Sequence, residues 1–278
     1  IRENDQPEDR AVLRLVVDAG SILETESQKG LAHFVEHMAF NGTGNFAKHQ
    51  IIDYLESIGM EFGPDINAHT GFDETVYKLQ IPTEDEEILE KGFQILADWA
   101  GRLSFEPEEI EAERGVIIEE WRLGRGAEAR MREEYLPVLL KGSRYAERLP
   151  IGEKEIIAGF EHRTLIDYYE TWYRPDLMAV VAVGDFDEER ILELIEENFS
   201  YLEIPENPEE RREYPVPRHE ETLFTTATDP EATTTLTELF YKREPREMET
   251  VEDYREMIKR RLFDMMLGAR LDEVARRG

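Results

Sequence analysis

Runs of apolar residues along the chain predict several strands. The β-branched and aliphatic run AVLRLVVDAG at 11–20 is typical of a buried strand that ends in a turn at its glycine. LMAVVAVGDF at 177–186 has the same character. INAHTGFDETVYKLQIP at 66–82 divides into a short strand, a turn at 71–74 and an alternating strand that ends at a proline.

Helical periodicity fills the stretches between these strands. Thr83 with Glu86 forms a capping-box pattern, Pro107 suits a first helical position, and Asp187 can cap a helix. We therefore expect helices at 29–40, at 46–59, from 83 to about 103, from 107 beyond 121, and at 187–199. The mixture predicts an α+β fold in which a mixed or antiparallel sheet packs against long helices.

The last third of the chain changes in composition. Residues 206–221 are dense in proline and charge and predict a linker after a first domain at 1–205. Beyond it, we expect a partial second domain at 222–278, with strands at 222–229 and 233–241 and a helix at about 249–268.

Charge and composition exclude several classes of protein. Sixty-three acidic residues against thirty-three basic ones give a formal charge of −30, which argues against nucleic acid and anionic membrane surfaces as partners. The acidity favours either solubility or attraction of basic substrates. No segment approaches the roughly 18 consecutive apolar residues of a membrane span. The absence of cysteine excludes disulfides, thiolate ligands and a cysteine nucleophile. The ends, at Ile1 and Gly278, lead us to expect a fragment.

The stretch HFVEHMAF at 33–40 places three polar groups in an apolar helix. Because successive helical residues advance by about 100°, His33, Glu36 and His37 share one arc while apolar residues occupy the rest. Burying two imidazoles and a carboxylate without partners would be costly. They form either a hydrogen-bonded cluster in the core or a metal site, since histidines at i and i+4 can aim at one ion while the glutamate holds a water. The order H-x-x-E-H is that of inverted zinc-peptidase motifs.

Further candidate ligands lie in EPEEIEAERGVIIEEWRLG at 106–124. Glu113 and Glu120, seven residues apart, fall about 20° from each other on a helix and interrupt an apolar stripe that includes Val116 and Ile117. A carboxylate in such a stripe needs a cation or a donor. The four remaining histidines, at 49, 69, 162 and 219, have no partner at helical spacing. We therefore expect them to be surface or strand residues rather than metal ligands.

With both motifs in hand, the chain resembles the inverzincin peptidases, the family of pitrilysin, insulin-degrading enzyme and the mitochondrial processing peptidase, and is most like bacterial zinc proteases of the PQQ-locus type. The matching stretches are GSILETESQKGLAHFVEHMAFNGTGNF, NAHTGFDETVY, ERGVIIEEWR and YYETWYRPDLMAVVAVGDF, which occur in the expected order and span most of 10–200. The resemblance implies a metallopeptidase half-domain followed by the start of a second, similar domain.

The resemblance also implies a zinc endopeptidase site. His33, His37 and Glu120 would bind one Zn²⁺ per chain, Glu36 would be the general base on a water molecule, and Glu113 would orient a ligating histidine. Hydrolysis of peptides or unfolded polypeptides would need no covalent intermediate.

One interval departs from the family pattern. His37 and the third glutamate lie several residues further apart than in better-known members, so the resemblance alone leaves the choice of glutamate open. Helical phase favours Glu120 over Glu119, because Glu119 points about 100° away.

Partners follow from the same resemblance. Asn67 and Ala68 would pair with an extended peptide substrate. A remaining C-terminal half of a longer protein would supply arginine and tyrosine donors for the oxyanion, so we expect this fragment alone to be a poor peptidase. A homo-oligomer stays open, and a periplasmic or exported bacterial location is implied.

Two other classes of protein carry a comparable motif or fold. A metal-dependent lyase acting on S-ribosylhomocysteine carries a similar helix but depends on cysteine, which this chain lacks. A non-catalytic structural or assembly homologue, which would bind metal or peptide without hydrolysis, typically has a degraded motif. Loss of bound metal on chelation would test that alternative.

Overall fold

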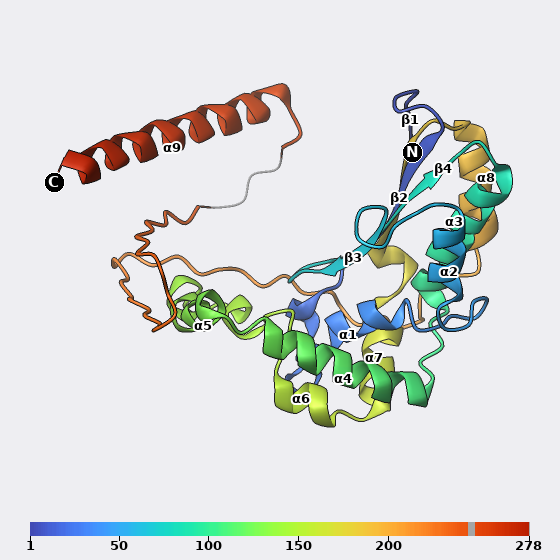
Figure 1. Ribbon diagram of the computed structural model, residues 1–278, viewed down its shortest axis with the longest axis horizontal. Coiled ribbons are helices and arrows are strands. Elements are labelled where there is room, and N and C mark those ends of the chain that lie inside the picture. Colours follow the sequence, from blue (N-terminus) through green and yellow to red (C-terminus); the bar gives the residue numbers. More distant parts are fainter. Residues whose placement is uncertain (244–247, 278) are drawn as a thin grey trace. The chain divides into compact units, whose positions relative to one another are not determined.

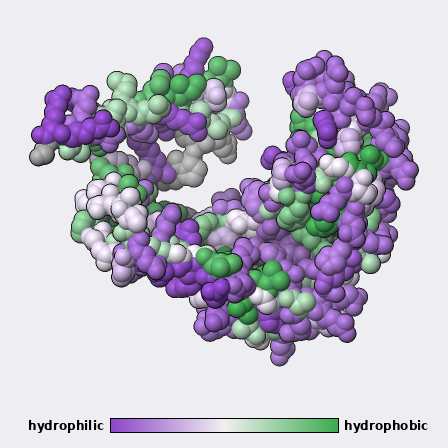
Figure 2. Space-filling model, in the orientation of Figure 1, coloured by the Kyte–Doolittle hydropathy of each residue, from purple (hydrophilic) through white to green (hydrophobic). Residues whose placement is uncertain are grey.

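A computed structural model describes residues 1–243 and 248–277 (Figure 1). It divides into two compact units, Ile1–Thr233 and Thr234–Gly278. The first unit carries the sheet and every candidate site residue. Hydrophilic residues cover much of the face drawn in Figure 2, as the excess of charged side chains requires.

The sheet of the first unit has five strands in the order β1-β5-β2-β4-β3. β1 and β5 are parallel, and all other neighbours are antiparallel, so the sheet is mixed. Its strands are β1 (Arg2–Glu3), β2 (Arg10–Val17), β3 (Ile66–Thr70), β4 (Thr75–Pro82) and β5 (Met178–Gly184). The strands predicted within 11–20, 66–82 and 177–186, and the turn between β3 and β4, are therefore confirmed.

Strand β2 shows why the sheet has this register. Every second residue is buried, including Leu13 and Leu15, while Arg14 between them is exposed. Leu13 lies opposite Leu79 of β4 and Ala182 of β5, which are also buried. A slip of one residue would move this apolar row out of the core, so burial fixes the pairing.

Helices pack against the sheet and against one another. α3 contacts β2, β4 and α8, while α1 contacts β3 and β4 as well as α4 and α7. Figure 1 shows α4, α6 and α7 gathered around α1. The helices are α1 (Leu31–Met38), α2 (Gln50–Ser57), α3 (Glu86–Gly101), α4 (Pro107–Leu123), α5 (Ala127–Leu139), α6 (Lys154–Gly159), α7 (His162–Trp172), α8 (Glu188–Phe199) and α9 (Val251–Arg277). The α+β fold with helices against a mixed sheet is confirmed.

Two predicted helix starts can be compared with the structure. Asp187 caps α8 as predicted, because its Oδ1 accepts a hydrogen bond from the backbone N–H of Arg190 at 2.9 Å. The capping box at Thr83 is wrong: Asp85 caps α3 by accepting from Glu87 N–H at 3.0 Å. The reason is that Thr83 N–H donates to Asp9 O at 3.0 Å, so Thr83 still follows the sheet.

The predicted strands at 222–229 and 233–241 are not formed; both segments, which lie wholly within the described residues, are irregular. A strand needs a neighbour to satisfy its backbone groups, and neither segment has one here. The predicted helix at about 249–268 is present as α9 and is longer than expected. Across the described residues, the helices are all too short or too polar to cross a membrane.

Candidate metal centre

Helix α1 begins at a point where two backbones touch. Gly30, just before the helix, has φ 99°, a left-handed conformation that favours glycine. Gly152 lies directly against it, and a Cβ on Gly152 would come within 2.3 Å of the Gly30 Cα. Both positions therefore require glycine, and the contact fixes where α1 starts.

A buried carboxylate satisfies the first turn of α1. Glu24 has no exposed surface, and its Oε1 accepts hydrogen bonds from Gly30 N–H at 3.0 Å and Ala32 N–H at 2.9 Å. These are donors that the helix itself cannot pair, and a negative charge is favourable there. Burial raises the pKa of Glu24 to about 8, although these backbone donors oppose the shift. Its Oε2 is buried and has no partner among the described residues.

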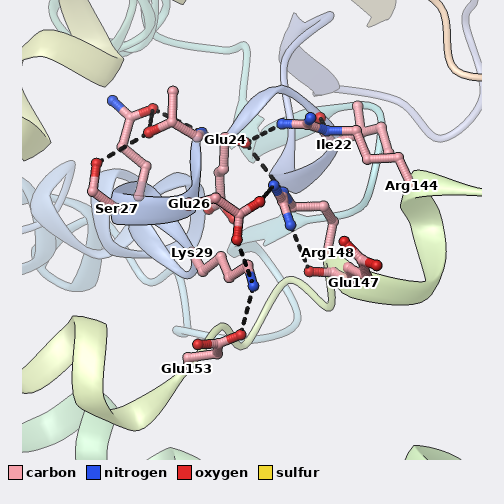
Figure 3. Close-up of polar contacts among 11 residues, drawn as sticks. Ile22, Glu24, Glu26, Ser27, Lys29, Arg144, Glu147, Arg148 and Glu153 are labelled. Atoms are coloured by element: carbon pink, nitrogen blue, oxygen red, sulfur yellow. Dashed lines mark hydrogen bonds and ion pairs between the residues drawn. The ribbon is translucent and has the colours of Figure 1, made fainter.

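Arginine and lysine side chains tie the segment before α1 to residues 144–153 (Figure 3). Arg148, which is 2% exposed, donates from Nε to Glu24 O at 3.1 Å, and Arg144 donates from Nε to Ile22 O at 2.8 Å. Lys29 Nζ lies 2.7 Å from Glu153 Oε1. Because Pro150 and Ile151 line the candidate cleft, this network also fixes one of its walls.

The other end of α1 is held by α3. Trp99 Nε1 donates to Ala39 O, immediately after α1, at 2.8 Å. Asp98 is fully buried and accepts from Thr43 Oγ1 at 2.5 Å and from Asn45 Nδ2 at 2.7 Å. Helix α1 is thus anchored at both ends.

The candidate site is a cleft of about 630 Å³ between α1, α4 and the β3 strand. Its lining contains all seven residues selected from the sequence, namely His33, Glu36, His37, Asn67, Ala68, Glu113 and Glu120. Phe40 and Phe62 add an apolar wall, with ring centroids 5.5 Å apart. His49 and His69 also line the cleft.

Three of these side chains converge on one point. His33 Nε2 lies 3.2 Å from His37 Nε2, His37 Nε2 lies 3.4 Å from Glu120 Oε2, and His33 Nε2 lies 3.8 Å from Glu120 Oε1. Metal–ligand bonds of about 2.0–2.1 Å in a tetrahedron place neighbouring ligand atoms about 3.4 Å apart. Both the donor types and their spacing therefore fit zinc.

The two histidines differ in the direction of their pKa shifts and in their hydrogen-bond partners. Burial, followed by the nearby His37, lowers the pKa of His33 to about 3, so His33 is neutral at pH 7 as a metal ligand must be. Burial also opposes charge on His37, but the hydrogen bond and charge of Glu113 raise its pKa overall. His33 Nδ1 is buried without a partner among the described residues.

Glu113 supports His37 from behind. Its Oε1 lies 2.8 Å from His37 Nδ1, and its Oε2 accepts from Asn41 Nδ2 at 2.7 Å. Burial disfavours the charge on Glu113, yet these two partners lower the pKa of its carboxyl below the ordinary value. The contact leaves His37 Nε2 facing His33 and Glu120.

Glu36 lies on α1 between the two histidines. Its side chain is 7% exposed, and its Oε2 accepts a hydrogen bond from Thr70 Oγ1 at 2.6 Å. Burial raises the pKa of Glu36, and the bond from Thr70 partly offsets that rise. A carboxyl poised in this way can exchange a proton with a molecule in the cleft.

The predicted apolar stripe on α4 is only partly present. Ile117 is buried as expected, but Val116 is 53% exposed and the Glu120 side chain 49%. Glu120 borders the open cleft, whereas Val116 is not among the residues that line it. Glu119 is 53% exposed and bonds to Arg122, outside the converging group.

Some contributors were not selected from the sequence. Thr70 reaches Glu36 from another element, and Asn41 reaches Glu113 across the turn after α1. Both lie in quoted motifs, NAHT and FNGT, which is the signal that could have drawn attention to them. Periodicity alone could not, because both contacts depend on tertiary packing.

Comparison with known proteins places the sequence in a family. A sequence model described as "Insulinase (Peptidase family M16)" matches residues 1–137, and one described as "Peptidase M16 inactive domain" matches residues 160–275. The candidate metal centre lies wholly in the first match.

Individual relatives point the same way. "Zinc protease PQQL-like" of Arabidopsis thaliana is 41% identical over the whole chain, which spans 29% of that protein. "Probable zinc protease PqqL" of Escherichia coli (strain K12) is 35% identical over 96% of the chain and 29% of its own length. The chain thus spans less than a third of these relatives.

A solved structure extends the agreement to the fold. The first half of the periplasmic protease PqqL from Escherichia coli matches with a TM-score of 0.73 and 38% identity, over 78% of this chain and 46% of that one. The resemblance read from the sequence is confirmed, and the chain belongs to peptidase family M16.

Proposed function

We propose that this chain carries the zinc site of an endopeptidase that hydrolyses peptides or unfolded polypeptides. The observation that carries the proposal is the convergence of His33, His37 and Glu120 within 3.8 Å of one another, with Glu36 beside them in one cleft. Relatives named zinc proteases support the choice of metal.

In this proposal, His33, His37 and Glu120 hold one zinc ion per chain, and Glu113 orients His37. Zinc bound there would polarise a peptide carbonyl and acidify a water molecule. Glu36 accepts a proton from the attacking water and delivers it to the leaving amine. His33 is neutral at pH 7, and with Glu113 accepting from His37 Nδ1, a neutral His37 would direct the lone pair of its Nε2 at the site.

The substrate would bind as an added strand. β3 stands at the end of the strand order, and its Asn67 and Ala68 line the cleft. Main-chain groups at an edge strand can pair with an extended peptide and read its backbone more than its sequence. A folded substrate segment would first have to open.

We further propose that the chain acts within a longer, periplasmic or exported protein. It spans less than a third of the relatives, and one relative is described as periplasmic. The longer protein would add donors for the tetrahedral oxyanion, so the 278 residues alone should be a poor peptidase; each lost donor costs about 10²–10³ in rate. A homo-oligomer is compatible with this arrangement.

The alternative is a non-catalytic homologue. The description "inactive domain" applies to the match over 160–275, whereas the complete H-x-x-E-H set and Glu120 lie within 1–137. A degraded motif would favour the alternative, and the first region shows none. The catalytic reading is therefore the better supported one.

The deciding experiment is Glu36→Gln. The amide keeps the shape of the side chain but cannot take a proton, so the variant should retain one zinc per chain and lose hydrolysis in the longer protein. Zinc is measured by metal analysis of this chain, and hydrolysis with an unstructured peptide. Activity near wild type in the variant would remove Glu36 from its role, and absence of zinc in the unmodified chain would remove the site.

A further inference from the structure

Thr70 stands where a hairpin meets the candidate site. It is the last residue of β3 and lies opposite Thr75, the first residue of β4. The turn between them is closed by Gly71 N–H, which donates to Glu74 O at 2.8 Å. The position of the Thr70 side chain is therefore set by strand pairing rather than by a free loop.

The hydrogen-bond pattern shows that the Thr70 hydroxyl donates its proton to Glu36. Thr75 is fully buried, and its Oγ1 donates to Ala19 O at 2.9 Å. Thr70 Oγ1 donates to Glu36 Oε2 at 2.6 Å, and a threonine hydroxyl has only one proton to give. The two hydroxyl oxygens are 3.5 Å apart, and each thus has its own acceptor.

The hydrogen bond from Thr70 fixes the orientation of the Glu36 carboxylate. The last torsion of a glutamate is broad and two-fold, so its two oxygens would otherwise exchange places easily. With Oε2 bonded to Thr70, Oε1 is the oxygen left for the cleft, which Glu36 lines. We propose that Thr70 is a positioning residue that selects Oε1 of Glu36 as the basic oxygen; this inference rests on the proposed function.

The same strand would link substrate pairing to the base. Side chains two apart on a strand share one face, so Ala68 and Thr70 lie on the same side of β3. Ala68 lines the cleft at the edge where a peptide would add, and Thr70 holds Glu36. A peptide paired with β3 would steady the strand that supplies the hydroxyl, so that occupancy of the cleft and orientation of the base are coupled.

The first test compares Thr70→Val, which keeps the shape but removes the hydroxyl, with Thr70→Ser, which keeps the hydroxyl. In the longer protein, Thr70→Val should lower kcat by roughly 10–100-fold, the usual size of a supporting contact, with little change in KM or zinc content. Thr70→Ser should recover kcat to within a few fold. Thr75→Val, which removes a neighbouring buried hydroxyl without touching Glu36, should lower stability and leave kcat nearly unchanged.

The second test needs no catalysis. In the metal-free 278-residue chain, unfolding of Thr70→Val, Glu36→Leu and the double variant forms a double-mutant cycle, and the two substitutions should be clearly non-additive. Additive effects, or wild-type kcat in Thr70→Val, or no recovery in Thr70→Ser would each overturn the inference. If hydrolysis is absent from the unmodified protein, the proposed function fails, while the cycle still reports whether Thr70 holds Glu36.

Discussion

Helices α1 and α4 face each other across the candidate metal centre, but they are built differently. α1 is short, and six of its eight residues are buried. Glu24 satisfies its first turn, and Trp99 bonds to the carbonyl just beyond its last residue. α4 has seventeen residues, of which only Ile110 and Ile117 are buried.

The attachment of α4 is also uneven along its length. Arg114 Nη2 donates to Phe160 O at 3.2 Å, and its guanidinium stacks over the Phe160 ring at 4.1 Å. Glu120 lies more than one turn further on and is half-exposed. The comparison teaches that α1 presents its two histidines from a buried helix, whereas Glu120 reaches the same point from a half-exposed part of α4.

The largest expected effect is on zinc affinity and concerns Glu120, the proposed metal ligand on α4. Glu120→Gln should weaken zinc binding severely, by more than the roughly 10–100-fold of a supporting contact, because a neutral amide is a poor ligand and two histidines leave the tetrahedron short. Glu119→Gln is the matched control, since Glu119 is similarly exposed and its carboxylate bonds to Arg122 outside the converging group. Competition with a chromogenic chelator gives both affinities.

Either of two results would break this assignment. If Glu119→Gln is the substitution that lowers zinc affinity, then α4 directs Glu119 rather than Glu120 at the metal. If Glu120→Gln keeps zinc while Glu113→Gln loses it, the roles of the two glutamates are reversed.

A smaller effect is expected for Glu113, the residue of α4 that bonds to His37 of α1. Glu113→Gln should cost roughly 10–100-fold in zinc affinity or activity, because the amide still reaches His37 Nδ1 but no longer carries the charge that favours the ligating tautomer. Asn41→Ala removes the other partner of Glu113 and should act in the same direction but more weakly. Equal affinities for Glu113→Gln and the unmodified chain would show that α1 presents His37 without help.

A separate effect, on stability rather than on zinc binding or catalysis, concerns Glu24. Because burial raises the pKa of Glu24 from 4.5 to about 8, its stabilising contribution is fully present below pH 4.5 and is lost as pH rises through about 8. Arg148 and Tyr168 are the charged and titratable groups that face it. Glu24→Gln cannot ionise, so the unfolding free energy of the unmodified chain should fall relative to the variant by on the order of a few kcal/mol across this range.

Urea unfolding of both proteins at several pH values measures that difference. The titration of groups that both proteins share cancels when the two unfolding free energies are subtracted. Parallel profiles would mean that the carboxylate is accommodated at the start of α1 without penalty. Zinc should be omitted, so that metal release does not add its own pH dependence.

The parts of this site that follow local periodicity could be predicted from the sequence. The spacing of His33, Glu36 and His37 places them on one arc of a buried helix, and the phase of α4 separates Glu120 from Glu119. The exposure of Glu120 could not be predicted, because it depends on an open cleft that distant segments of the chain form together.

Other features depend on contacts between distant segments. The pairing of β3 with β4 places the Thr70 hydroxyl where it donates to Glu36. Asp85 rather than Thr83 caps α3, because the Thr83 N–H donates to Asp9, the residue before β2. The strands expected at 222–229 and 233–241 had suitable residues but no neighbouring strand. Local propensity proposes such elements, and tertiary pairing decides them.

The placement of the tryptophans gives the two halves of the site separate optical signals. Trp99 is fully buried and bonded to the backbone just after α1, whereas Trp121 follows Glu120 directly and lies partly exposed under the guanidinium of Arg125, 4.5 Å from its ring. Fluorescence from Trp99 should therefore be blue-shifted and poorly quenched by iodide, while that from Trp121 should respond to zinc. With single-tryptophan variants, emission spectra would show whether zinc changes the surroundings of Trp121 and leaves those of Trp99 unchanged.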